Sequence, residues 1–163
     1  MIGTIKELLK RVKLESLKFQ SDFVEAEFSF NNNDKDAAWE LYVEMITRVV
    51  TQNLKLTEGD EKSALESVYS LFPITREILK RRGRDCTQFA KIAVAVLNQI
   101  IRPFTAKWHK KSLKGAFQDS KECQYFRNDL RKLQIELRKY AHLLAVVADV
   151  EDLTYINGEF NEK

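Results

Sequence analysis

Glycine, proline and cysteine are scarce in this chain of 163 residues, which holds five glycines, two prolines and two cysteines. A fold built from many short strands needs more turn residues than that, so the composition favours helices over a many-turned β fold. Cys86 and Cys123 are too few for a disulfide framework, and we see no secretory signal ahead of them. The sequence therefore predicts a helical protein of the reducing cytoplasm.

Long hydrophobic runs and the common catalytic motifs are absent as well. The longest apolar run covers residues 92–97, far short of the ~20 residues that a membrane-spanning helix needs. The chain has no glycine-rich phosphate loop, no Gly-x-Ser-x-Gly elbow, and no His-Glu-x-x-His or Glu-x-x-His motif. We therefore predict no membrane span and no cofactor, and the lack of a catalytic constellation favours a protein that is not an enzyme.

Charge is distributed in three blocks. Residues 1–70 carry 9 Lys and Arg against 13 Asp and Glu, residues 71–146 carry 17 against 6, and residues 147–163 carry 1 against 5. The overall net charge of +3 conceals this separation. A strongly basic part of a folded protein attracts anions, so the middle block points to nucleic acid, a phosphorylated ligand or an acidic partner.

Apolar residues at helical spacing predict a helical bundle over residues 34–148. A first helix is expected from the capping residues that end at Asp34 to about Gln52. A second is expected to begin after the cap Asp60 and to be kinked or broken near Pro73, because proline cannot donate the helical hydrogen bond.

The third helical pattern begins at Asp85 and is interrupted by Pro103. The apolar stripe resumes after the proline, so we expect a bend at residues 101–102 and a second helical piece to about Lys114. Gly115 then ends this piece.

The last helix has the clearest pattern in the chain. Asp119 and Ser120 supply a cap, and apolar residues then follow in a strict alternation of three and four positions. This seam is typical of one helix in an antiparallel bundle, although it would also suit an interface with a partner chain. Its members are Cys123, Phe126, Leu130, Leu133, Leu137, Tyr140, Leu144 and Val147.

The N-terminal part shows a period of two instead. Residues 12–20 are rich in Val, Leu and Phe, and a turn signal at Ser21-Asp22 follows them. We therefore expect a β-hairpin over residues 12–30, which must lie on the helices or pair with another chain. Before it, residues 2–13 form a possible amphipathic helix that packs against the domain. The alternating apolar residues of the second strand are Val24, Ala26, Phe28 and Phe30.

These patterns predict a mainly α fold, a four- to five-helix bundle with an N-terminal β-hairpin. We expect a single domain of residues 1–163 that ends in an acidic tail at 149–163. Asn157-Gly158 in this tail is a hairpin-turn signal, and either a small hairpin or a frayed end is compatible with so short a segment.

A metal site would have to combine Cys86, His109, Cys123 and His142, which are separated by 23, 14 and 19 positions. These separations lack the close ligand pairs that make zinc sites recognisable, so no metal is predicted. Cys86 lies beside two arginines that would lower its pKa, but a small apolar core residue is the commoner role for such a cysteine.

The basic middle block supplies the candidate binding residues. Around Pro103, an aromatic ring interleaved with cations suits a stacked base whose phosphates are held by lysines. The competing interpretation is that Phe104 and Trp108 belong to the core and that the lysines form the solvated face. The candidate anion-binding residues are Arg81, Arg82, Arg84, Arg102, Lys107, Trp108, His109, Lys110, Lys111, Arg127 and Arg131.

Three functions are compatible with these observations. The first is a non-enzymatic interaction or regulatory module with a protein partner or with a second copy of itself. The second is binding of nucleic acid or another polyanion through residues 76–139. The third is an enzyme with its site at the Pro103 bend, where His109 would act with a group from a neighbouring helix.

Overall fold

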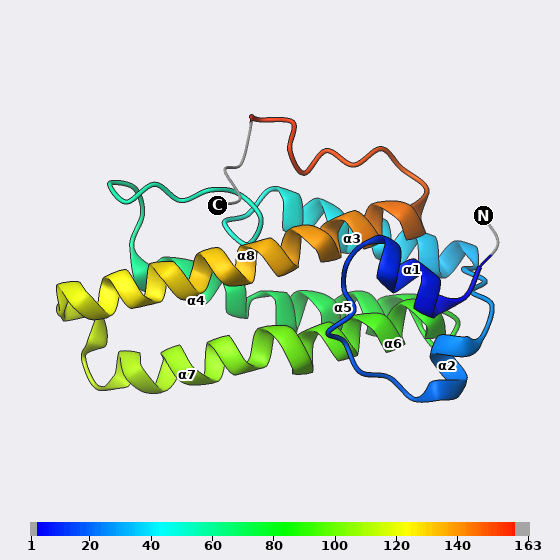
Figure 1. Ribbon diagram of the computed structural model, residues 1–163, viewed down its shortest axis with the longest axis horizontal. Coiled ribbons are helices and arrows are strands. Elements are labelled where there is room, and N and C mark those ends of the chain that lie inside the picture. Colours follow the sequence, from blue (N-terminus) through cyan, green and yellow to red (C-terminus); the bar gives the residue numbers. More distant parts are fainter. Residues whose placement is uncertain (1–2, 159–163) are drawn as a thin grey trace.

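The computed structural model describes residues 3–158, which fold mainly into helices (Figure 1). These residues form no strand and only one isolated bridge, between Thr4 and Glu27. The predicted mainly α fold is therefore confirmed. In chain order the elements are α1 (Ile5–Arg11), α2 (Ser21–Glu25), α3 (Asn32–Ile46), α4 (Glu61–Tyr69), α5 (Leu71–Arg82), α6 (Thr87–Val96), a π-helical turn (Leu97–Ile101), α7 (Arg102–Leu113), a 3-10 turn (Ala116–Gln118) and α8 (Ser120–Ala148).

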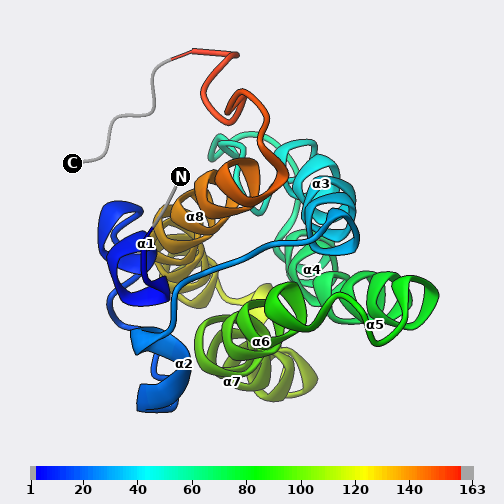
Figure 2. The same cartoon turned by 90° about the vertical axis from the view of Figure 1, so that its right-hand side faces the viewer.

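The helices are arranged as rods that run along the long axis of the molecule (Figure 1). The rods are α3, α4 continued by α5, α6 continued by α7, and α8, and the most extensive contact is between α3 and α8. In the end view, α1 and α2 lie to one side of the bundle, and the C-terminal segment lies above α3 and α8, on the side opposite to α5 and α7 (Figure 2).

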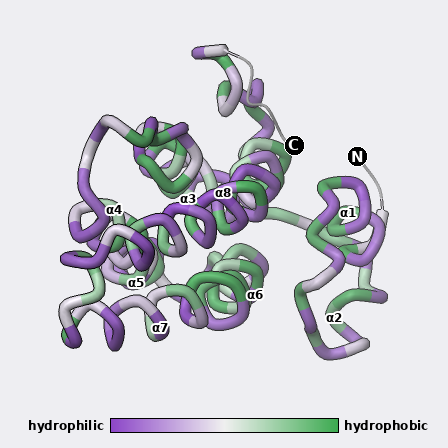
Figure 3. Tube along the Cα trace, turned by 60° about the vertical axis from the view of Figure 1, so that its left-hand side comes forward, coloured by the Kyte–Doolittle hydropathy of each residue, from purple (hydrophilic) through white to green (hydrophobic). Residues whose placement is uncertain are grey.

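The core is one continuous hydrophobic cluster that includes residues from α1 to α8. The predicted seam of α8 faces this cluster from Phe126 to Val147, whereas Cys123 at its start is only half-buried. The seam is therefore internal to the bundle. Figure 3 shows α6 as mostly hydrophobic, in contrast with the mixed colouring of α5 and α7, which carry more of the polar surface.

Both prolines interrupt helices where expected. α4 ends at Tyr69 and α5 begins at Leu71, which places Pro73 in the first turn of α5, where a missing N–H costs no helical hydrogen bond. Pro103 lies in the first turn of α7, directly after the π-helical turn. A π turn contains one extra residue and changes the local hydrogen-bond pattern. This change accommodates the N–H group that Pro103 lacks.

The capping residues at the start of α3 also connect it to α6. Asn31 and Asp34 form a reciprocal capping box, as the sequence indicates. The buried Asp34 carboxylate also accepts a hydrogen bond from the Phe89 backbone N–H in the first turn of α6, at 2.9 Å. One carboxylate therefore satisfies donors at the N-termini of two helices and fixes their relative position.

The predicted β-hairpin over residues 12–30 is wrong. Residues 12–20 form an irregular segment, and Ser21–Glu25 is a short helix. The extended residues around Phe28 instead pair with the N-terminus, where Phe28 N–H donates to Gly3 O at 2.9 Å and Ile5 N–H donates to Ala26 O at 3.2 Å. Phe28 and Phe30 are half-buried against the bundle, whereas Val24 belongs to α2 and Ala26 is exposed. Alternation of apolar residues in the sequence therefore does not correspond to a strand here.

α3 ends at Ile46, six residues before the expected Gln52. The Thr47 hydroxyl donates to the carbonyl of Val43 at 2.8 Å and competes with the helical hydrogen bonds. A run rich in β-branched residues, from Thr47 to Thr51, also disfavours continuation of the helix. Residues 47–60 therefore form a long connection between α3 and α4.

The described part of the acidic tail is fixed to the bundle by polar contacts. The Tyr42 hydroxyl donates to Asp152 Oδ1 at 3.2 Å, and the other oxygen of Asp152 lies 3.0 Å from His142 Nδ1. Burial is the main cause that raises the pKa of Tyr42. The predicted turn signal at Asn157-Gly158 adjoins residues 159–163, which lie outside the described residues.

Candidate nucleic-acid interface

Arg81 and Arg82 are directed toward α3. Both guanidinium groups contact the Glu40 carboxylate, and Arg82 Nη1 also lies 3.2 Å from Asp36 Oδ2. Arg81 has a second carboxylate partner in Glu77, at 3.6 Å. Because each of these arginines is already paired, the two residues fasten α5 to α3 and contribute little free positive charge.

Trp108 lies in the core with an exposed fraction of 0%. Its ring stacks on Phe117 with 6.0 Å between centroids and meets the edge of Phe126 at 5.2 Å. The indole N–H donates to Asp129 Oδ2 at 3.1 Å, so its polar atom is satisfied inside the protein. A ring enclosed in this way has no free face for a base, which favours the core interpretation of the segment around Pro103.

The lysines beside Trp108 are paired with acids of α8. Lys107 Nζ lies 2.7 Å from Asp129 Oδ2, and Lys111 Nζ lies 2.8 Å from Glu122 Oε2. Both ammonium groups also approach the indole, at 5.2 and 5.1 Å from the ring centroid. These two lysines connect α7 to α8, and their charges are largely compensated.

The Asp129 carboxylate allows a test of this pairing. Burial alone would raise the pKa of Asp129, but hydrogen bonds from Lys107 and Trp108 outweigh burial and lower the pKa below its usual value. Such a group stabilises the fold above its unfolded-state pKa of about 3.9, and the stabilisation is lost as pH falls through the folded-state pKa. We expect Asp129→Asn to lower the free energy of unfolding at neutral pH, with a difference from wild type that shrinks below about pH 4. Urea unfolding at a series of pH values measures this, and a difference independent of pH would contradict it.

The predicted basic row on α8 divides into buried and exposed members. Arg127 is buried, with Nε 2.8 Å from Glu61 Oε1 and Nη1 2.8 Å from the Lys55 carbonyl. About two and three turns further along, Gln134 and Arg138 donate to carbonyls of the same 47–60 connection. These polar side chains hold the connection against α8, while Arg131, between them in sequence, is exposed.

Exposed cations remain on α5 and α7. Of the predicted residues, Arg84, Arg102, Lys110 and, on α8, Arg131 are exposed, and no carboxylate forms an ion pair with them within residues 3–158. Arg76 and Lys80 on α5, which lie in the predicted segment 76–139 but were not among the candidate residues, share this property. We call Arg76, Lys80 and Arg84 the basic row, because they follow one another at intervals of four residues along α5 and into the turn after it.

An aromatic patch lies at the beginning of this row, where the junction of α4 and α5 faces α7. The ring centroids of Tyr69 and His109 are 5.2 Å apart, and those of Tyr69 and Phe72 are 5.6 Å apart. The Arg102 guanidinium carbon lies 4.8 Å from the Phe72 centroid. These four side chains, which we call the aromatic patch, therefore form an unbroken line of contacts across the two helical rods.

Sequence reasoning found two members of the patch, His109 and Arg102, and missed Tyr69 and Phe72. Phe72 lies on the apolar stripe and is indeed buried. Tyr69 lies off that stripe and is 45% exposed. An aromatic residue outside the apolar stripe of an amphipathic helix was the available signal, because burial does not explain its position.

The cysteines and histidines do not converge. No group of three or more possible metal ligands occurs within the described ranges. Burial is the main cause that raises the pKa of both Cys86 and Cys123, so neither thiol is poised as a thiolate nucleophile. His109 contacts Tyr69 at the end of α4, whereas His142 contacts Asp152 in the C-terminal segment.

The Pro103 bend opens onto a shallow groove of about 420 Å³ between α7 and α8. Its ionisable lining includes Lys107 paired with Asp129, and Glu136, which pairs with Lys139. His109 is not among the lining residues. A carboxylate whose pKa is lowered is a weak general base, so Asp129 is poorly suited to that role at neutral pH.

Within residues 3–158, no helix combines the length and the apolar character needed to cross a membrane. Comparison of the chain with protein-family models, with curated proteins and with solved structures finds no match.

Proposed function

We propose that this protein is a binding module that contacts nucleic acid through the exposed cations of α5 and α7. The single observation that carries the proposal is the group of exposed cations, without a carboxylate ion pair in the described structure, that lies on α5, in the turn after it and on α7. This group comprises the basic row together with Arg102 and Lys110, whereas other exposed cations such as Lys121 and Arg131 lie on α8.

The distribution of acids strengthens this argument. Residues 71–118 contain 11 Lys and Arg but only two acids, Glu77 and Asp85. Glu77 is already paired with Arg81. Glu40 of α3 pairs with Arg81 and Arg82, and Asp129 and Glu122 of α8 pair with Lys107 and Lys111, as described above. A surface with excess positive charge attracts the phosphate backbone without reading its sequence.

The direct test is fluorescence anisotropy with labelled single-stranded RNA and DNA and with duplexes of the same length, in salt from about 50 to 200 mM. Each phosphate contact contributes about 0.7 to the slope of log affinity against log salt for single strands. Replacing all three arginine and lysine side chains of the basic row with Gln should therefore lower that slope by about 2.

The matched control removes three exposed cations from other surfaces. Lys10, Lys62 and Lys121 are exposed, and they have no carboxylate partner in the part of the chain that the structure describes. Replacing these three with Gln changes the net charge equally and should leave the slope unchanged. Equal effects of the two triple variants would show only net-charge attraction, and no binding by wild type at the lowest salt would overturn the proposal.

An acidic protein is the alternative ligand for the same surface. Polyglutamate competes with nucleic acid for a surface that recognises carboxylates, whereas a phosphate-binding surface prefers the nucleic acid. If polyglutamate displaced the labelled nucleic acid at the same concentration of charges, an acidic protein would be the better candidate for the ligand of this surface. Association with a protein partner or with a second copy, and a cytoplasmic location, stay predictions from the sequence.

A further inference from the structure

The aromatic patch offers something that the cations alone do not, namely exposed π surface. Tyr69 is 45% exposed, while its ring is held in place by contacts with His109 and Phe72. A ring that is fixed by neighbours loses little conformational freedom when a planar ligand stacks on it. His109 is half-buried and lies with its ring at the edge of Tyr69, with 70° between the two planes.

Arg102 adds a second planar group to the patch. Its guanidinium lies over the buried Phe72 ring, and its Nε and Nη2 donate to Asn98 Oδ1 at 3.1 and 3.0 Å. The aromatic face on one side and the amide hydrogen bonds at the edge orient the guanidinium plane. Arg102 is exposed, so a ligand can reach this side chain from solvent. A guanidinium plane held in this way can stack on a nucleobase.

The basic row begins one helical turn beyond the aromatic patch on α5. Arg76 lies one helical turn beyond Phe72 on α5, and Lys80 lies one turn beyond Arg76. Four residues of α-helix advance by about 6 Å, so the cations continue in short regular steps away from the patch. Lys110 is adjacent to His109 on α7. Planar groups flanked by cations are the combination with which proteins bind single strands.

We propose that the ligand is single-stranded nucleic acid, with bases stacked on Tyr69 and on the Arg102 guanidinium and with phosphates held along the basic row. This inference rests on the proposed function and specifies its ligand. In a duplex the bases are stacked on one another and their faces are inaccessible, so the exposed rings would contribute nothing to duplex binding. A single strand gains both the stacking and the electrostatic contribution.

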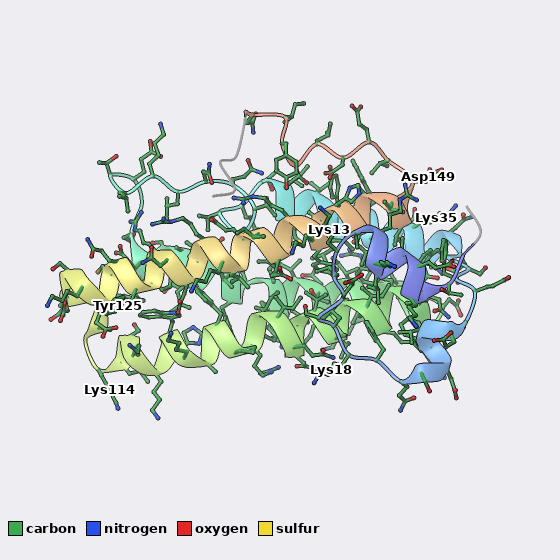
Figure 4. All side chains as sticks on the ribbon, in the orientation of Figure 1. Lys13, Lys18, Lys35, Lys114, Tyr125 and Asp149 are labelled. Carbon is green, nitrogen blue, oxygen red and sulfur yellow. The ribbon has the colours of Figure 1, made fainter. Side chains whose placement is uncertain are left out.

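The test compares three tyrosine variants by the same anisotropy measurement. Tyr69→Ala should weaken single-strand binding between about fivefold and a hundredfold, the range expected when a base-stacking aromatic is removed. The salt slope should stay at the wild-type value, because no cation is lost. Tyr69→Phe keeps the ring and should bind like wild type. Tyr125→Ala is the matched control, because Tyr125 is an exposed tyrosine near the beginning of α8 that makes no ring contact with the patch (Figure 4).

Arg102→Lys supplies an independent variant that keeps the charge but removes the plane. It should weaken single-strand binding while leaving the salt slope unchanged, since lysine holds a phosphate but does not stack. Circular dichroism and thermal unfolding verify that each variant is folded.

The outcomes separate this inference from the proposed function. Equal affinity of wild type for single strands and duplexes, or wild-type affinity of Tyr69→Ala, would overturn the stacking inference. If the triple Gln variant of the basic row still lowered the salt slope in that case, the proposed function would stand without the stacking inference. No binding of either nucleic acid by wild type would overturn both.

Discussion

Replacing Trp108 with alanine is expected to lower the free energy of unfolding by about 3–5 kcal/mol. The side chain is fully buried and contacts Phe117 and Phe126, so its removal leaves a cavity in the core between α7 and α8. The substitution also removes one of the two hydrogen bonds that Asp129 receives. Urea unfolding followed by far-ultraviolet circular dichroism measures the loss.

The second tryptophan provides the matched control for this prediction. Trp39 on α3 is 45% exposed, so Trp39→Ala should cost far less than Trp108→Ala. Trp108→Phe retains an aromatic ring in the core and should give an intermediate loss. If Trp108→Ala left stability intact and instead weakened nucleic-acid binding, Trp108 would be a stacking platform and the core interpretation would be wrong.

The parts of the fold that the sequence predicted correctly depend on local signals. α8 begins at Ser120 with Asp119 as its cap, and its apolar residues repeat for the length of the helix. The break near Pro73 follows from the chemistry of one residue. In each case the determining interactions lie within a few positions of each other, so a pattern in the sequence is enough to reveal them.

The wrong hairpin shows where local signals fail. A period of two reports which side chains are buried, but it does not report which chain segment supplies the hydrogen bonds. The extended residues near Phe28 find their partners at Gly3 and Ile5, in a segment that was predicted as part of a helix. The helix itself is present but begins only at Ile5, after the Thr4 cap.

The candidate site was only partly predictable for a related reason. Counting charges identifies a basic segment, but the charge that remains free depends on partners distant in sequence. Arg81 is 41 positions from Glu40, Lys107 is 22 from Asp129, and Arg127 is 66 from Glu61. Folding therefore removes these cations from the candidate surface and leaves others, such as Arg76 and Lys80, which lie in the predicted segment 76–139 but were not among the candidate residues.

Replacing Arg127 with alanine is the second substitution for which we expect a large effect, a loss of about 3–5 kcal/mol in the free energy of unfolding. The side chain is only 8% exposed and pairs with Glu61, which is 17% exposed. It also donates to the carbonyls of Lys55, Glu58 and Gly59. Truncation leaves a nearly buried carboxylate without its partner and releases the 47–60 connection. Urea unfolding measures the total loss, and hydrogen exchange should show faster exchange at the amides of this connection.

Two further variants separate the effect of the unpaired Glu61 charge from the effect of losing the hydrogen bonds that hold the 47–60 connection. Arg127→Met combined with Glu61→Met removes both charges, so it should recover much of the stability, because burying two apolar side chains avoids the desolvation of an unpaired carboxylate. Arg131→Ala removes an exposed arginine one turn away and should change stability by no more than about 0.5 kcal/mol. If Arg127→Ala kept full stability and lowered the salt slope of nucleic-acid binding, Arg127 would contact phosphate. The large buried contribution assigned to it would then be wrong, and the binding surface would extend onto α8.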